Sequence, residues 1–278
     1  MLKRPLTVLQ WSSRRALAKT GLEATQIPSP AGRQTVWRGG QGPVLVLLHG
    51  AGDQAGSWAR VANDLAADYT LLVPDLAGHG ESAPRTGPIE VSTILAGVEA
   101  VVEAEARSQP VTLVGNSLGG WMALLVAHRH PEWVERAVVI SGGAIRGQNT
   151  NVKVSPASRE EARATVAATR DPSSPPVPDF LLDDIVRNAQ RGPLGRFAAT
   201  AASMGEYLLD GRLHEVRVPV ELLWGESDRL MPLDYAQRLA AGLPRVRLTT
   251  IPRCGHVPQV ECPAAFVAAL RQVLGSAS

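Results

Sequence analysis

A serine flanked by glycines, in Gly115-Asn-Ser-Leu-Gly119, is the pattern in this 278-residue chain that most directly suggests chemistry. Residues 111–114, Val-Thr-Leu-Val, precede it like a strand, and a helical pattern follows it. A turn this tight needs glycines two residues either side of the serine, because side chains there would collide with neighbouring elements. We predict that Ser117 is a nucleophile exposed at the end of a strand, against the alternative of a chance match in a Gly-rich chain.

A serine hydroxyl at neutral pH is a weak nucleophile and needs a base within hydrogen-bond reach. His256 lies in a loop between the last predicted strand and the last predicted helix, where its side chain can return over the carboxyl edge of a sheet. The other histidines lie at a helix end, at the exit of an insertion, or in tight turns that favour structural hydrogen bonds: His128, His130, His214, His49 and His79. We therefore predict His256 as the base.

The base needs an acid that fixes its tautomer and stabilises the imidazolium. Asp228 directly follows the predicted strand 218–224, again at a carboxyl end. Glu226 is a local rival, and Asp210 is a poorer candidate at the end of the insertion. The chain order Ser117, Asp228, His256 is one of the orders in which such triads occur.

The oxyanion of an acyl-transfer reaction needs backbone donors. The N–H of Leu118, at the start of the helix after Ser117, is one predicted donor, and the N–H of Ala51 in the Gly-containing loop after strand 44–48 is the other. That loop could instead cradle a phosphate, but it lacks the Lys-Ser/Thr of a P-loop and the third glycine of a dinucleotide site. We therefore expect no nucleotide.

Continuous apolar runs alternate with helical patterns along most of the chain. Strands are predicted at 35–37, 44–48, 69–73, 111–114, 136–141, 218–224 and 246–251, and helices at 58–67, 89–107, 118–130, 233–241 and 263–274. This alternation predicts right-handed βαβ units and a mostly parallel sheet covered on both faces, an α/β fold.

The strand–helix rhythm stops between residues 143 and 213. Helices are predicted at 159–169, 180–190 and 194–207, and the Pro-rich stretch 171–178 excludes regular structure. We predict a small helical cap at 143–213, a core at 34–142 and 214–278, and an N-terminal helix with a lead-in at 1–33. The cap residues Phe180, Phe197, Met204 and Tyr207 either line the substrate pocket or pack the cap's own core.

Five motifs together resemble the α/β-hydrolase superfamily, across roughly residues 35–275. They are His49-Gly-Ala-Gly, Asp75-Leu-Ala-Gly-His-Gly-Glu-Ser82, Gly115-Asn-Ser-Leu-Gly-Gly120, Trp224-Gly-Glu-Ser-Asp228 and Cys254-Gly-His256. The resemblance implies an eight-stranded, mostly parallel sheet, a cap inserted after the sixth strand, no metal or organic cofactor, and an architectural role for the Asp75 loop. Serine at the nucleophile position departs from the epoxide hydrolases and haloalkane dehalogenases, which carry aspartate there.

Bulk composition excludes several classes of protein. A formal charge of +2 with 19% charged residues, and no run of basic residues interleaved with aromatics, argues against nucleic-acid binding. Cys254 and Cys262 fit neither a disulfide framework nor a four-ligand metal site, so we expect two unpaired thiols. With no convincing signal peptide, these thiols favour a cytoplasmic location.

Residues 1–15 resemble an amphipathic helix, and no stretch approaches the roughly 20 apolar residues that span a bilayer. This helix leaves open a weak contact with a membrane surface, against the alternative of a helix packed on the core. The oligomeric state is not predicted.

The predicted activity is hydrolysis of small-molecule carboxylic esters through an acyl-enzyme. Small to medium acyl groups are favoured because the cap is short and the chain has only 12 aromatic residues (3 Phe, 6 Trp, 3 Tyr) to line a long acyl tunnel. The alternatives are a carbon–carbon bond hydrolase of vinylogous diketones, a lactonase, thioesterase or perhydrolase, and a receptor-like binding protein with a retained triad. Fold and triad cannot separate these activities, since specificity resides in the pocket.

Overall fold

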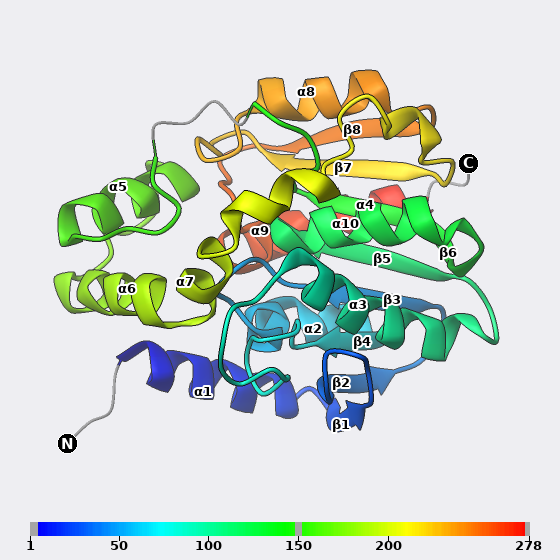
Figure 1. The fold of residues 1–278 in the computed structure, drawn as a ribbon, viewed down its shortest axis with the longest axis horizontal. Helices are drawn as coiled ribbons and strands as arrows, with labels where there is room; N and C mark the ends of the chain where they lie inside the picture. The colour runs from blue at the N-terminus through cyan, green and yellow to red at the C-terminus, as the bar shows by residue number, and fades with distance from the viewer. Residues whose placement is uncertain (1–4, 148–151, 276–278) are drawn as a thin grey trace.

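The chain folds around one eight-stranded sheet in the computed structural model, which describes residues 5–147 and 152–275 (Figure 1). The strands are β1 (Glu23–Ile27), β2 (Gln34–Gly40), β3 (Val44–Leu48), β4 (Thr70–Pro74), β5 (Val111–Asn116), β6 (Val134–Ile140), β7 (Val220–Gly225) and β8 (Val246–Ile251). Their order is β1-β2-β4-β3-β5-β6-β7-β8, and β2 alone runs opposite to the other seven strands. The predicted eight-stranded, mostly parallel sheet is confirmed.

Successive residues of the central strands point into two separate cores. In β3, Leu45 and Leu47 belong to the core on one face, whereas Val46 and Leu48 belong to the core on the other. All four side chains are buried. A strand buried on both faces is apolar at every position, which is why its sequence does not alternate.

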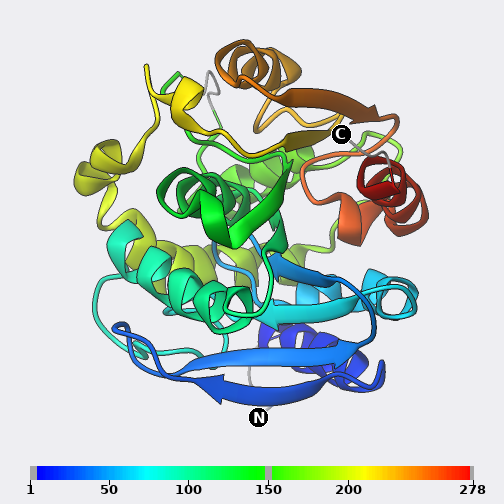
Figure 2. The same cartoon turned by 90° about the vertical axis from the view of Figure 1, so that its right-hand side faces the viewer.

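Helices cover both faces of the sheet (Figure 2). The core that contains Val46 and Leu48 also contains side chains of α3 (Val91–Ala106), α4 (Leu118–Arg129) and α8 (Leu233–Gly242). The core that contains Leu45 and Leu47 also contains side chains of α2 (Ala59–Ala66) and α10 (Pro263–Gly275). Short connecting helices are η1 (Ala55–Trp58), η2 (Pro131–Trp133), η4 (Leu213–Glu215) and α9 (Pro258–Glu261). The arrangement predicted from the strand–helix alternation is therefore present.

Among the described residues, the connection between β6 and β7 holds four helical segments besides η4: α5 (Arg159–Thr169), α6 (Asp179–Arg191), α7 (Pro193–Ala198) and η3 (Ala201–Tyr207). The first three lie at the left of Figure 1. The helix expected at 194–207 is interrupted, because α7 ends at Ala198 and the chain continues as a 3₁₀ helix from Ala201. We refer to residues 152–213 as the cap; residues 148–151 of the predicted insertion lie outside the described residues.

The N-terminal helix α1 (Pro5–Ala18) packs on the core, with Leu17 fully buried. A Cβ atom on Gly56 would lie 2.6 Å from the Ser13 Oγ, so this glycine permits the close approach of α1 to η1. Residues 1–4 of the predicted helix lie outside the described residues. Among the helices of the described ranges, none has the length and apolar content needed to cross a membrane.

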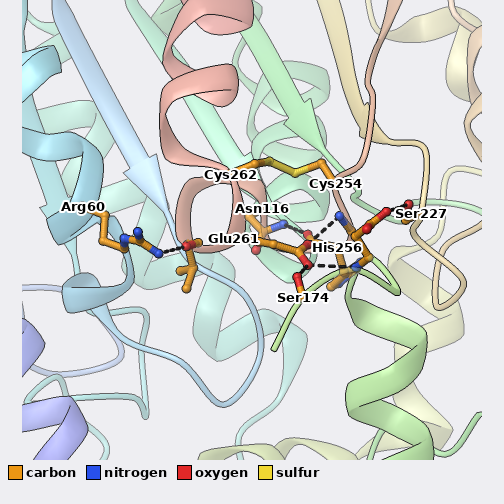
Figure 3. Close-up of a disulfide and its surroundings, with 11 residues drawn as sticks. Arg60, Asn116, Ser174, Ser227, Cys254, His256, Glu261 and Cys262 are labelled. Carbon is orange, nitrogen blue, oxygen red and sulfur yellow. Dashed lines mark hydrogen bonds between the residues drawn. A yellow bond between two sulfur atoms is a disulfide. The ribbon is translucent and has the colours of Figure 1, made fainter. Parts of the chain in front are cut away.

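The two cysteines form a disulfide, so the prediction of unpaired thiols was wrong (Figure 3). After β8 the chain turns through the loop that carries His256 and then forms the one-turn helix α9, which doubles the chain back. The Cα atoms of Cys254 and Cys262 are thereby 6.1 Å apart, within the range that a disulfide spans. A spacing of eight residues gave no sign of this reversal.

Candidate active site

Ser117 occupies a strained turn between β5 and α4. Its φ is +52°, a left-handed conformation that non-glycine residues rarely adopt. A Cβ atom on Gly115 would lie 2.2 Å from the carbonyl oxygen of Gly119, and one on Gly119 would lie 2.2 Å from that of Leu48. Both glycines are therefore required by close backbone contacts, as we predicted from the sequence. Backbone strain held by its surroundings is often found at functional sites.

His256 and Asp228 meet at the carboxyl ends of β7 and β8. The distance between His256 Nδ1 and Asp228 Oδ2 is 2.8 Å, and both residues are buried, at 5% and 4% exposure. The other carboxylate oxygen of Asp228 accepts the backbone N–H groups of Leu230 (3.0 Å) and Met231 (2.9 Å). With Nδ1 donating to the carboxylate, Nε2 is the nitrogen left to accept a proton.

The rival acids lie elsewhere. Glu226 accepts a hydrogen bond of 2.8 Å from Thr250 Oγ1, and Asp210 accepts the backbone N–H of Arg146 at 3.1 Å. Asp228 is thus the acid that the fold brings to His256.

The backbone around His256 is held on several sides. Its N–H donates to Thr169 O (2.9 Å), and its carbonyl accepts Asn116 Nδ2 (2.8 Å). Gln259 in turn donates to Asn116 Oδ1 (3.2 Å). The sequence prediction gave Asn116, Gln259 and Thr169 no role; only the position of Asn116 beside Ser117 could have drawn attention to it.

The loop that carries Ala51 approaches Ser117 closely. A Cβ on Gly50 would lie 3.4 Å from Ser117 Cβ. Ala51, Ser117 and Leu118 all line one cavity. This arrangement brings together the serine and both residues predicted to supply oxyanion donors.

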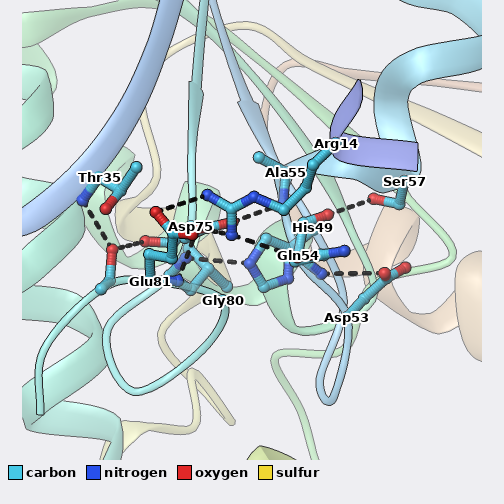
Figure 4. A network of polar contacts seen from close by, with 12 residues as sticks. Arg14, Thr35, His49, Asp53, Gln54, Ala55, Ser57, Asp75, Gly80 and Glu81 are labelled. Carbon is cyan, nitrogen blue, oxygen red and sulfur yellow. Dashed lines mark hydrogen bonds and ion pairs between the residues drawn. The ribbon is translucent and has the colours of Figure 1, made fainter. Parts of the chain in front are cut away.

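A polar network joins the segments on either side of the Ala51 loop to the Asp75 loop (Figure 4). Asp75 accepts the N–H of Ala55 (2.8 Å) and pairs with Arg14 (3.1 Å). His49 Nε2 accepts the N–H of Leu76 (2.9 Å), and His79 Nδ1 lies 3.1 Å from Ala77 O. Burial lowers the pKa of His49 to about 4 and, with the nearby His49, that of His79 to about 3. Neutral, backbone-bound histidines of this kind are architectural.

The cavity above Ser117 has a volume of about 450 Å³ and is largely apolar. Its apolar lining residues come from both the core and the cap, and include Trp121, Ile145, Leu194, Phe197, Met204, Leu208, Leu230 and Met231. Among the described residues that line it, Arg146 alone carries a charge.

Two of the four cap residues considered as pocket walls do not line this cavity. Phe180 is 57% exposed on α6. Tyr207 is not among the lining residues, although its carbonyl accepts Trp121 Nε1 at 3.0 Å. Within the described part of the chain, no three His, Cys, Asp or Glu side chains gather where they could hold a metal ion.

Comparisons with known proteins find one matching family and related hydrolases. The model of the alpha/beta hydrolase family matches residues 45–269. A 2-hydroxy-6-oxononadienedioate/2-hydroxy-6-oxononatrienedioate hydrolase of Paraburkholderia phymatum is 30% identical over 255 residues, which cover 83% of this chain and 86% of the relative.

Solved structures share the same architecture. A membrane phospholipase A, described as a bacterial virulence factor, superposes with a TM-score of 0.80 at 26% identity, over 97% of this chain and 93% of that one. Carboxylesterase CesB from Bacillus subtilis gives a TM-score of 0.77 at 21% identity, over 96% and 99%. The likeness to CesB concerns the fold alone.

Proposed function

We propose that this chain, which belongs to the alpha/beta hydrolase family, is a serine hydrolase of carboxylic esters with small to medium acyl groups. Its similarity to a carboxylesterase and to other hydrolases supports this proposal. The observations that carry the proposal are the buried 2.8 Å contact between His256 and Asp228 and a serine, Ser117, held at φ +52° on the wall of an apolar cavity.

The mechanism follows from these positions. Ser117 Oγ attacks the ester carbonyl carbon while His256 Nε2 takes its proton, and Asp228 stabilises the resulting imidazolium. The N–H groups of Ala51 and Leu118 bind the oxyanion, helped by the positive end of α4. His256 returns the proton to the departing alcohol, which leaves an acyl group on Ser117. A water molecule, activated by His256, then releases the acid.

The cavity supports the substrate class. A volume of about 450 Å³ with an apolar lining suits an acyl group of modest size, whose burial stabilises the complex by about 0.8 kcal/mol per methylene. We therefore expect turnover to rise from acetyl to butyryl or hexanoyl esters and to fall for long chains.

A second candidate is carbon–carbon bond hydrolysis, which the relative from Paraburkholderia phymatum favours. The name of that relative describes a substrate with two carboxylates, and Arg146 is positioned on the cavity wall where it could meet one carboxylate. Lactonase, thioesterase and receptor functions would use the same groups, and no specific feature favours them.

The experiment is to follow p-nitrophenolate release from acetyl, butyryl, hexanoyl and octanoyl esters by the parent, Ser117→Ala and the exposed control Ser108→Ala. The proposal expects turnover in the parent and the control and none above background in Ser117→Ala. If the folded parent turns over no ester but cleaves a vinylogous diketone, the second candidate takes its place.

Location and surface contacts are further proposals. Cytoplasmic location stays a prediction, and the disulfide removes the free thiols that were part of its basis. Weak membrane contact through α1 is supported by Trp11, which is 57% exposed beside Arg15. Sedimentation with anionic lipid vesicles, comparing the parent with Trp11→Ala, tests this contact.

A further inference from the structure

The cap segment 168–174 is hydrogen-bonded to both loops that carry the candidate acid and base. The backbone N–H of His256 donates to Thr169 O at 2.9 Å, and that of Arg229, next to Asp228, donates to Ala168 O at 2.8 Å. The segment therefore forms part of the scaffold around the His256–Asp228 pair.

Glu261, in α9, joins this cap segment to the His256 loop through one carboxylate (Figure 3). Its Oε2 accepts the backbone N–H of Gly255 at 2.6 Å. Its Oε1 accepts the backbone N–H of Asp171 at 2.8 Å and the hydroxyl of Ser174 at 2.5 Å. Hydrogen bonds to an ionised acceptor are stronger than those between neutral groups, so this carboxylate is a firm connection.

The connection continues to the acid loop. The Asp171 carboxylate accepts the hydroxyl of Ser227, the residue before Asp228. Hydrogen bonds from Ser173 and then Ser227 lower the pKa of Asp171 to about 2. Asp171 is therefore ionised at neutral pH, and a chain of contacts runs from Gly255 through Glu261 and Asp171 to Ser227.

The His256 loop and the cap segment also touch directly. A Cβ atom on Gly255 would lie 2.3 Å from Thr169 O and 2.8 Å from Arg170 Cα. The two backbones are therefore in direct contact at Gly255. The hydrogen bonds of the Glu261 carboxylate are a second connection between the same two segments.

We propose that Glu261 is a positioning residue for His256: its carboxylate holds the His256 loop against cap segment 168–174, and so maintains the His256–Asp228 geometry. The inference rests on the proposed function for its effect on rate. Glu261 does not line the cavity, so it is not expected to contact substrate. Its loss should therefore lower kcat and leave KM nearly unchanged.

Glu261→Gln tests the proposal with the side-chain volume preserved. The amide has one acceptor oxygen where the carboxylate has two, and its NH₂ group would face an N–H or hydroxyl donor. We expect kcat for p-nitrophenyl butyrate to fall by about 10- to 100-fold, as for a displaced catalytic group, with KM within about twofold. Glu226→Gln, whose carboxylate binds Thr250, is the matched control and should retain the parent's kcat.

Ser174→Ala tests the same contact from the cap side. It removes one of the three donors to Glu261, so a smaller decrease in kcat is expected. Combined with Glu261→Gln it should add nothing, because the contact is already broken. Full additivity of the two changes would contradict the proposal.

A proton NMR signal separates this proposal from the proposed function. We expect the proton between His256 Nδ1 and Asp228 to resonate far downfield, where it reports their geometry without substrate. Glu261→Gln should broaden or shift this signal while thermal unfolding still shows a folded protein. An unchanged signal with unchanged kcat overturns the proposal, as does a loss of kcat that merely follows the unfolded fraction. If the parent hydrolyses no ester, the proposed function fails, and the NMR comparison still decides the role of Glu261.

Discussion

Asn116 Nδ2 lies 2.8 Å from the backbone carbonyl oxygen of His256, so the residue preceding the candidate nucleophile holds the loop of the candidate base. The two residues are 140 positions apart in the chain. Asn116 is 1% exposed and also donates to Ile140 O at 3.2 Å. This relationship fixes the distance between the nucleophile turn and the His256 loop independently of the hydrogen bond to Asp228.

Asn116→Ala should lower kcat by about 10- to 100-fold, because a small displacement of the base from the nucleophile is costly to the rate. It should also reduce the free energy of unfolding by about 1–3 kcal/mol, since the buried carbonyl of His256 loses its partner. Ester kinetics and urea unfolding measure the two effects. Asn63→Ala, at an exposed position of α2, is the control. Parent-like kcat in Asn116→Ala would contradict a positioning role.

Asp228→Asn should lower kcat by about 10⁴-fold, because an amide at this position favours the wrong tautomer of His256 and does not stabilise the imidazolium. Glu226→Gln should keep kcat within about twofold of the parent, as its side chain binds Thr250. Stopped-flow or steady-state ester kinetics on both variants make the comparison. The reverse order of effects would reassign the acid to Glu226.

Replacing both cysteines, in Cys254→Ser/Cys262→Ser, should lower the free energy of unfolding by about 2–3 kcal/mol, the loop-closure value for a separation of 8 residues. Urea unfolding with and without dithiothreitol measures the change. The parent should lose the same amount in reductant, whereas the double variant should be insensitive to it. Two free thiols in the unreduced parent would contradict the disulfide.

The buried histidines predict how stability changes with pH. The folded pKa values of His49 (about 4) and His79 (about 3) lie below the ordinary value of 6.5, so below 6.5 the unfolded state binds more protons. Burial acts oppositely on Asp53 and raises its pKa from 3.8 to about 6, so there the folded state binds one proton more. Between pH 4 and 6 the net difference is about one proton in favour of the unfolded state.

The free energy of unfolding should therefore decrease by about 1.4 kcal/mol for each pH unit lost between pH 6 and 4. Urea unfolding curves at half-unit intervals give this slope. Asp53→Asn removes the opposing proton and should steepen it toward about 2.8 kcal/mol per unit. A stability that rises on acidification would contradict neutral, buried His49 and His79.

Most of the fold could be predicted because its central strands are buried on both faces, which leaves mostly apolar runs such as residues 44–48 and 111–114. β1 was missed because Glu-Ala-Thr-Gln-Ile is mostly exposed at the sheet edge and carries no such run. Its strand character comes from pairing with β2, which local sequence does not reveal.

The candidate site could be predicted as far as residue type and position after a strand allow. Ser117, Asp228 and His256 each follow a strand that the sequence predicts, so their shared edge follows from the parallel sheet. The contacts of Asn116, Glu261 and the two cysteines depend on how the chain turns after β8 and on where the cap docks. Neither feature has a local sequence signal, because both arise from tertiary packing.

The central claim is that Ser117 forms the acyl-enzyme, and mass spectrometry of the protein after reaction with a p-nitrophenyl phosphonate tests it most directly. We predict one adduct per chain, mapped to the peptide containing Ser117, formed in step with the loss of esterase activity and absent from Ser117→Ala. An adduct on another residue, or ester turnover that persists in Ser117→Ala, would contradict the account.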